Sequence, residues 1–195
     1  MLVLASASPR RQELLRNADI PFIVHPTEIA EIPNPVETPR AFAERMAKEK
    51  AEAVLRQRPA DVILGADTVV TVDGEILGKP VDESDAARML RLLSDRTHTV
   101  ITGVCLMRAG DRELRTGYSD IRSETTLVTM NALTDRDIAT YVASGEPMDK
   151  AGAYAIQGRA SRWITRIEGD YFNVVGLPVS LVFKMLRQHG VAANR

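Results

Sequence analysis

The sequence has little cysteine and little histidine, and both shortages exclude kinds of site. A single cysteine, Cys105, excludes an internal disulfide framework and a zinc site built from four cysteines. It stands in the apolar run 104–107, which indicates a buried structural thiol. The three histidines are scattered, without the paired spacing of metal ligands, at His25, His98 and His189.

An excess of charge of either sign is also missing. Among 195 residues, 25 lysines and arginines stand against 26 aspartates and glutamates, which gives a formal net charge of −1. Non-specific binding of nucleic acid needs a basic surplus spread over a surface, so this balance predicts no nucleic-acid partner. An anionic ligand would then be held by a local cluster of cations.

Long apolar runs are absent too. No stretch approaches the roughly 20 apolar residues that a membrane span needs, which predicts no membrane partner. The first five residues are apolar, but arginines follow them instead of preceding them, which is the wrong order for a signal peptide. These absences favour a cytoplasmic, soluble α/β protein.

Two familiar catalytic motifs are not found. The sequence contains no G-x-S-x-G elbow of a serine hydrolase. Residues 74–80 look like a phosphate-binding P-loop, but their glycine spacing is one residue short. Pro80 also stands where a serine or threonine should bind magnesium, so Walker-type chemistry is not expected.

What is present mixes strand-like and helix-like segments, in a length that fits one domain or two lobes sharing a core. Strands are expected over residues 2–5, 22–25, 62–72, 75–77, 97–107, 113–128 and 162–167. Helices are expected over 9–18, from Thr38-Pro39 onward, over 84–94, from Thr134 to Ser144, and from Pro178 to near Gly190. A loop should fill 146–160. The pattern predicts an α/β fold with a mixed sheet flanked by helices.

Asp67 breaks the local pattern most clearly, and such breaks are where function is usually found. It lies in the apolar run 62–70, where an ionised carboxylate is costly unless it is paired, hydrogen-bonded or bound to a metal. Gly65 and Ala66 beside it allow a close approach to the backbone. Asp67 is therefore either a base or metal ligand, or a structural carboxylate held by backbone amides.

Two lysines are also out of place. At about 100° per residue, Lys50 falls inside the apolar arc of its helix, so it either snorkels to water or faces a ligand. If Asp73-Gly74 forms a two-residue hairpin turn, Lys79 lies opposite Thr68, next to Asp67. There it could make a structural ion pair or serve a site.

Cations near a helix start suggest a phosphate ligand. Arg10 and Arg11 follow a strand and open a helix capped by Ser8, which suits phosphate capture, although solvated arginines at a plain turn would look the same. Carboxylates without a histidine cluster favour a hard cation such as Mg²⁺, which arrives with substrate phosphates. Glu31 and Asp67 are the first candidates, with Asp149 a third.

Five motifs then occur in order along nearly the whole chain: SASPRR at 6–11, GADT at 65–68, GKP at 78–80, GEPMDKAGAYAIQG at 145–158, and GDYFNVVGLP at 169–178. Together they resemble the Maf family of nucleoside triphosphate pyrophosphatases. The resemblance implies hydrolysis to the monophosphate and pyrophosphate with a divalent cation, Mg²⁺ or Mn²⁺, in the cytoplasm. It further implies a Maf/ITPase-like fold, in which two lobes of a twisted mixed sheet surround a central nucleotide-binding cleft, often as a homodimer.

The resemblance also assigns roles to residues. The proton acceptor falls on Asp67, and the other catalytic positions are Glu31, Lys50 and Lys79. The metal ligands are Glu31 and Asp67. The positions that bind substrate or select it are Ser8, Arg10, Thr68 and Gln157. The whole of 1–195 would form a single such domain.

The run 146–150 and the ending Gln157-Gly158 look like the branch of the family that acts on dTTP and UTP. Gln157 can donate and accept hydrogen bonds, which suits the edge of a uracil or thymine ring. Ala155 departs from the glycine usual in the family and could constrain that loop. Two other functions stay open: an ITP/XTP-type purine pyrophosphatase, and a non-enzymatic nucleotide-binding regulator of septum formation and cell division.

Overall fold

The computed structural model describes residues 1–110 and 116–191. Within these ranges the strands are β1 (Leu2–Leu4), β2 (Ile23–Val24), β3 (Val62–Val72), β4 (Glu75–Leu77), β5 (Thr97–Arg108), β6 (Tyr118–Met130) and β7 (Ile164–Glu168). They form one sheet in the hydrogen-bonding order β2-β1-β3-β5-β6-β7, with β4 paired to β3. Parallel pairs join β1 to β2 and β3, whereas β4 and β7 run antiparallel to their neighbours. The mixed α/β fold predicted from the sequence is confirmed.

The helices start where capping residues predict them. They are α1 (Pro9–Asn17), α2 (Pro39–Leu55), α3 (Glu83–Leu93), α4 (Asp135–Val142), α5 (Tyr171–Val175) and α6 (Val179–Gln188). Ser8, Thr38 and Thr134 each accept a backbone N–H at the start of a helix, as expected from their positions. None of these helices in the described ranges is both long and apolar enough to cross a bilayer.

Two segments differ from expectation. The predicted loop 146–160 contains short 3₁₀ helices, η1 (Glu146–Asp149), η2 (Ala151–Ala153) and the start of η3 (Arg159–Trp163), and α5 was not anticipated. Small residues such as those of this segment are compatible with several kinds of tight turn, so their pattern does not predict a 3₁₀ helix. Residues 113–115, expected to open a long strand, lie outside the described residues.

The chain divides into two compact units. Unit 1 comprises Met1–Asp67, Thr102–Glu124 and Gly176–Arg195, and unit 2 comprises Thr68–Ile101 and Thr125–Val175. Strands β3, β5 and β6 contribute residues to both units. Asp67 is the last residue of the first segment of unit 1, and Thr68 is the first residue of unit 2.

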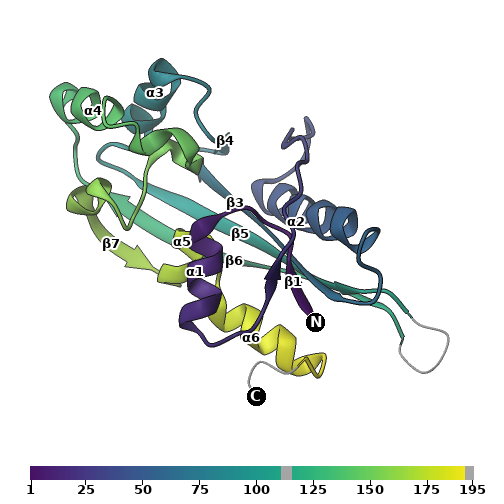
Figure 1. Ribbon diagram of the computed structural model, residues 1–195. Coiled ribbons are helices and arrows are strands. Elements are labelled where there is room, and N and C mark those ends of the chain that lie inside the picture. Colours follow the sequence, from purple (N-terminus) through teal and green to yellow (C-terminus); the bar gives the residue numbers. More distant parts are fainter. Residues whose placement is uncertain (111–115, 192–195) are drawn as a thin grey trace. The chain divides into compact units, whose positions relative to one another are not determined.

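In unit 1, β1 is flanked on both sides by parallel strands. Because such crossovers are right-handed, the two connecting helices α1 and α2 must cover opposite faces, and Figure 1 shows them on opposite sides of β1. The face under α2 is a core cluster made of small and medium apolar side chains: Val3, Ala5, Ala47, Ala51, Val54, Ile63, Cys105 and Met107. Cys105 is buried, as predicted, and burial raises its pKa to about 11.

In unit 2, the hairpin between β3 and β4 follows the predicted register. Asp73 and Gly74 both have positive φ, which the type I′ turn of a two-residue hairpin requires. Backbone pairing begins at Val72–Glu75 and ends at Val70–Leu77, so the ladder stops two residues short of Lys79. Helix α3 packs against α4 and η2, and Figure 1 shows α3 and α4 side by side.

Candidate active site

Three charged side chains from separate segments meet in unit 1. Lys50 Nζ on α2 donates to Asp67 Oδ1 on β3 at 2.6 Å and to Glu31 Oε1 at 2.7 Å. Asp67 is only 5% exposed and Lys50 only 7% exposed. The Lys50 ammonium therefore bridges two carboxylates, and Asp67 is held by charged partners instead of the backbone amides alone.

The close approach of α2 to β3 explains how Lys50 reaches Asp67. A Cβ at Gly65 would lie 2.1 Å from the carbonyl oxygen of Ala47, so any other residue there would push the helix away. The space beside Asp67 that the sequence suggested is thus filled by α2. One helical turn after Ala47, Lys50 is aimed at the carboxylate two residues along the strand.

Arg11 supports the same strand from α1. Its Nη1 donates to the Ala66 carbonyl at 2.9 Å and to Ser6 Oγ at 3.2 Å, and its Nε donates to the Gly176 carbonyl at 2.8 Å. Arg11 is buried and its guanidinium holds backbone carbonyls, so its capture of phosphate together with Arg10 stays a prediction. Helical geometry separates the two neighbours by about 100°, which leaves Arg10 half-buried.

Burial is the largest influence on the proton affinity of Asp67. It raises the pKa of the Asp67 carboxyl, and the positive charges of Lys50 and Arg11 oppose that rise. The nearby charge of Glu31 adds to the rise. Asp67 is thus a carboxylate whose basicity is increased by desolvation while paired cations favour its ionised form.

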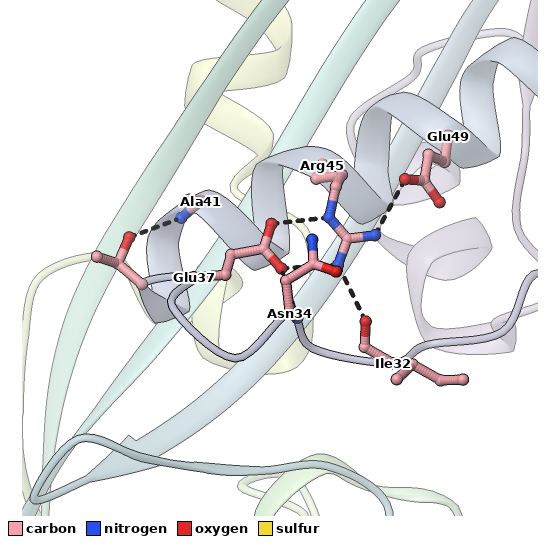
Figure 2. A network of polar contacts seen from close by, with 7 residues as sticks. Ile32, Asn34, Glu37, Ala41, Arg45 and Glu49 are labelled. Atoms are coloured by element: carbon pink, nitrogen blue, oxygen red, sulfur yellow. Dashed lines mark hydrogen bonds and ion pairs between the residues drawn. The ribbon is translucent and has the colours of Figure 1, made fainter.

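The loop that carries Glu31 is attached to α2 by Arg45 (Figure 2). The guanidinium donates to both carboxylate oxygens of Glu37 at 2.7 Å, to the Ile32 carbonyl at 3.0 Å and to Glu49 at 3.0 Å. Ile32 directly follows Glu31, so this fork holds the backbone beside the carboxylate that Lys50 contacts. No sequence pattern predicts this contact, because Arg45 lies on the polar side of its helix among other charges.

Ser8 and Arg10 lie at the start of α1. Ser8 Oγ accepts the Arg11 N–H at 3.4 Å as the helix cap, and the Ser8 N–H donates to Ser6 Oγ at 3.2 Å. Arg10 occupies the second position of α1. Both residues thus belong to unit 1 with Glu31, Lys50 and Asp67.

The other predicted site residues belong to unit 2. Thr68 is half-buried in β3, Lys79 is exposed beyond β4, and Gln157 is exposed in a turn. The Gly78 carbonyl beside Lys79 accepts the Gly152 N–H of η2 at 3.1 Å. The backbone just beyond the β3–β4 pairing is therefore hydrogen-bonded to η2.

Asp149 forms an ion pair with Lys150 and is largely exposed in unit 2, and its role as a third metal ligand stays a prediction. Within residues 1–110 and 116–191, no group of three or more histidine, cysteine, aspartate or glutamate side chains could hold a metal. Two carboxylates, Glu31 and Asp67, are present together, and they share Lys50 Nζ.

Comparisons with known proteins match nearly the whole chain. Residues 1–189 match the family described as Maf-like protein. A Koribacter versatilis (strain Ellin345) protein named "dTTP/UTP pyrophosphatase" is 53% identical over 190 residues, 97% of this chain and 95% of that protein. A Symbiobacterium thermophilum protein of the same name is 51% identical over 189 residues, 97% of this chain and 94% of that protein.

Among solved structures, one titled "The structure of the Staphylococcus aureus Ham1 protein" matches with a TM-score of 0.49 at 13% identity. It covers 96% of this chain and 98% of that chain. The family match extends over almost all of the sequence, and about half of the aligned residues are identical in relatives of similar length. The chain belongs to the family of Maf-like proteins.

Proposed function

We propose that this protein is a nucleoside triphosphate pyrophosphatase that hydrolyses dTTP and UTP to the monophosphate and pyrophosphate. The observation that carries the proposal is the identity of about half of all residues, over nearly the full length, with relatives named for that activity. The contact of the buried Asp67 and Lys50 with Glu31 supports it, because burying a carboxylate in an apolar strand is costly even when it is paired.

In the proposed reaction, Asp67 is the base. A water oxygen attacks the α-phosphorus while the Asp67 carboxylate accepts a proton from that water. The bond between the α-phosphorus and the bridging oxygen breaks, and its electron pair leaves with pyrophosphate. Burial favours this role, because a raised pKa makes Asp67 a stronger base than an exposed aspartate.

Cationic side chains would stabilise the negative charge of the triphosphate. Lys50 keeps the Asp67 carboxylate aimed and adds fixed positive charge beside it. We assign the same electrostatic role to Arg10 and Lys79. Thr68 and Ser8 would contact the substrate through their hydroxyls, and Gln157 would read the edge of the base.

A divalent cation, Mg²⁺ or Mn²⁺, fits the donor chemistry of this centre. Such ions take oxygen ligands and are commonly held by one or two carboxylates, with water and substrate phosphates completing the shell. Glu31 and Asp67 would be those carboxylates. When bound, the cation would neutralise charge on the phosphates. Lys50 would then share its carboxylate partners with the ion.

The remaining proposals concern the setting of the activity. We expect the protein to work in the cytoplasm, on free nucleotides. We also expect the 195 residues to act as one functional domain and to form a homodimer.

A panel of triphosphates tests the function directly. Pyrophosphate release is measured from dTTP, UTP, CTP, ATP, GTP, ITP and XTP, with Mg²⁺, with Mn²⁺ and with chelator. The proposal expects dTTP and UTP to give the highest kcat/KM, with loss of activity in chelator. Higher activity on ITP or XTP would favour a purine pyrophosphatase instead. Tight dTTP binding without pyrophosphate release would favour a non-enzymatic regulator.

A further inference from the structure

The Gln157 side chain is carried by a turn whose two ends are tied to one pair of residues in unit 2. The turn runs from Ala155 to Gly158 and is closed by the Gly158 N–H, which donates to the Ala155 carbonyl at 3.0 Å. Gln157 is one of its two central residues, and it is exposed. A side chain at such a position takes its direction from the turn beneath it.

Tyr141 holds the first end of the turn. Its hydroxyl oxygen accepts the Ala155 N–H at 3.1 Å and donates to Glu146 Oε1 at 2.9 Å. Tyr141 is fully buried on α4 and packs edge-on against Trp163, with ring centroids 5.3 Å apart. Burial raises the pKa of the Tyr141 hydroxyl, so it stays protonated and able to donate.

Glu146 holds the other end. Its carboxylate accepts the Arg159 N–H at 3.0 Å on Oε1 and 3.3 Å on Oε2. The backbone of Glu146 is fixed in turn, because Lys150 Nζ donates to its carbonyl at 2.8 Å. A continuous path of hydrogen bonds therefore runs from Ala155 through Tyr141 and Glu146 to Arg159.

Gly158 makes room for the Glu146 carboxylate in this path, because glycine has no side chain. A Cβ at Gly158 would lie 2.1 Å from Glu146 Oε1, which is shorter than any contact a side chain could tolerate. The carboxylate therefore packs directly on the backbone of the turn. A turn held at both ends by buried or half-buried groups loses little further conformational entropy when its side chain binds a ligand.

We propose that Tyr141 and Glu146 are positioning residues for base selection, which fix the Ala155–Gly158 turn so that Gln157 meets the base in one orientation. The inference rests on the proposed function, because it assumes that Gln157 reads the base. It adds that selection depends on two side chains that need not touch the substrate themselves. In the sequence, Glu146 stands only as the first residue of the run 146–150, and nothing connects it to Tyr141 five positions earlier.

The test compares base discrimination, defined as kcat/KM for UTP divided by that for CTP, ATP or GTP. The variants are Tyr141→Phe, Glu146→Ala and Gln157→Ala. Tyr141→Phe and Glu146→Ala should lower discrimination about tenfold, approaching Gln157→Ala, with a smaller change in kcat for UTP. Glu146→Gln should retain most of the wild-type discrimination, because the glutamine amide oxygen can accept the same hydrogen bonds.

Tyr154→Phe is the matched control. Its hydroxyl is buried in the same unit and bonds His98 Nε2 at 2.8 Å, whereas the N–H of the next residue, Ala155, is held by Tyr141. It should cost comparable stability and leave discrimination unchanged. Equal loss of discrimination in Tyr154→Phe and Tyr141→Phe would overturn the proposal, since any buried hydroxyl would then serve.

A double-mutant cycle tests whether Tyr141 acts through Gln157. In the Gln157→Ala background, Tyr141→Phe should lower discrimination no further. An additive loss of discrimination in the double variant would overturn the inference, and so would a wild-type enzyme that does not discriminate between bases. In either case, pyrophosphate release from UTP would still support the proposed function. Amide hydrogen exchange gives a readout independent of activity: the Ala155 and Arg159 amides should exchange faster in Tyr141→Phe but not in Tyr154→Phe, and unchanged exchange would overturn the inference.

Discussion

The charged centre of unit 1 and the Gln157 turn of unit 2 are built in opposite ways. The centre joins Glu31, Lys50 and Asp67 from a loop, a helix and a strand, and its contacts are between full charges. The Gln157 turn is held within residues 141–159, by backbone amides and a tyrosine hydroxyl with one carboxylate.

This difference separates two tasks. A group that must change its protonation during a reaction benefits from burial and from charged neighbours that shift its pKa. A group that must only present hydrogen bonds to a base benefits from fixed geometry. Changes in the charged centre should therefore act mainly on turnover, and changes around the Gln157 turn mainly on choice of substrate.

The largest expected effect comes from removing the base. Asp67→Asn keeps the shape of the side chain but cannot accept a proton, so kcat for UTP should fall about 10³-fold or more. Circular dichroism and gel filtration should show an unchanged fold. Asp61→Asn is the control, because Asp61 is also an ion-paired aspartate, beside the start of β3, bonded to Arg58 and the N-terminus. Activity near wild type in Asp67→Asn would rule out its role as base.

Arg11 should matter for stability more than its neighbour does. Arg11→Lys cannot reproduce the donors to the Gly176 and Ala66 carbonyls and to Ser6, so the free energy of unfolding should fall by about 4 kcal/mol. Urea denaturation measures it. Arg10→Lys, one position earlier, should cost less than about 1 kcal/mol but reduce kcat/KM for UTP. Equal losses of stability in the two variants would contradict the distinct burial of these arginines.

A buried neutral histidine distinguishes unit 2 from the charged centre. Burial lowers the pKa of His98 from 6.5 to about 4. The unfolded chain therefore binds a proton before the folded one does, and stability from this group is present above pH 6.5 and is lost as pH falls towards 4. The full difference corresponds to about 3 kcal/mol.

His98→Gln tests this, because glutamine can still bond Tyr154 but cannot titrate. Between pH 7 and pH 4, the free energy of unfolding of the wild type should fall by about 3 kcal/mol more than that of His98→Gln. Thermal unfolding at a series of pH values gives the measurement. Parallel curves for the two proteins would mean that His98 does not resist protonation. His25→Gln serves as control, since it leaves His98 in place.

Local signals predicted most of the fold. Ser8, Thr38 and Thr134 start helices because a side-chain oxygen next to an orphan N–H is a short-range interaction that the sequence displays directly. The Asp73-Gly74 hairpin is equally local. The 3₁₀ helices of 146–160 depend on contacts with α3 and α4, which no local pattern contains.

The sequence predicted the burial of charges in this centre, but not the connections between them. Burial of Asp67 and Lys50 could be expected from a charge placed among apolar neighbours, and the structure joins them at 2.6 Å. The direction of Arg11 could not, because two adjacent arginines look alike until the helix is packed. The Tyr141–Glu146 contact could not either, since its only trace in the sequence is the small residue at Gly158.

The smallest expected effect concerns the loop that carries Glu31. Arg45→Met removes the fork that holds Glu37 and the Ile32 carbonyl, and it leaves the ion pair between Lys50 and Glu31 in place. The entropy of the freed loop should then oppose placement of Glu31, and kcat/KM for UTP should fall about fivefold. Base discrimination should stay unchanged, because Arg45 supports the loop of the charged centre and not the Gln157 turn.

Lys48→Met is the matched control for Arg45→Met. Lys48 lies on the same helix and pairs with Glu52 at 3.5 Å, one turn along. Lys48→Met should leave kcat/KM for UTP equal to that of the wild type within experimental error, because an exposed ion pair of this kind contributes little to stability. If Arg45→Met behaved the same way, the Lys50–Glu31 ion pair alone would position the loop. If Arg45→Met altered discrimination instead of turnover, the division between a charged centre for chemistry and a hydrogen-bonded turn for selection would fail.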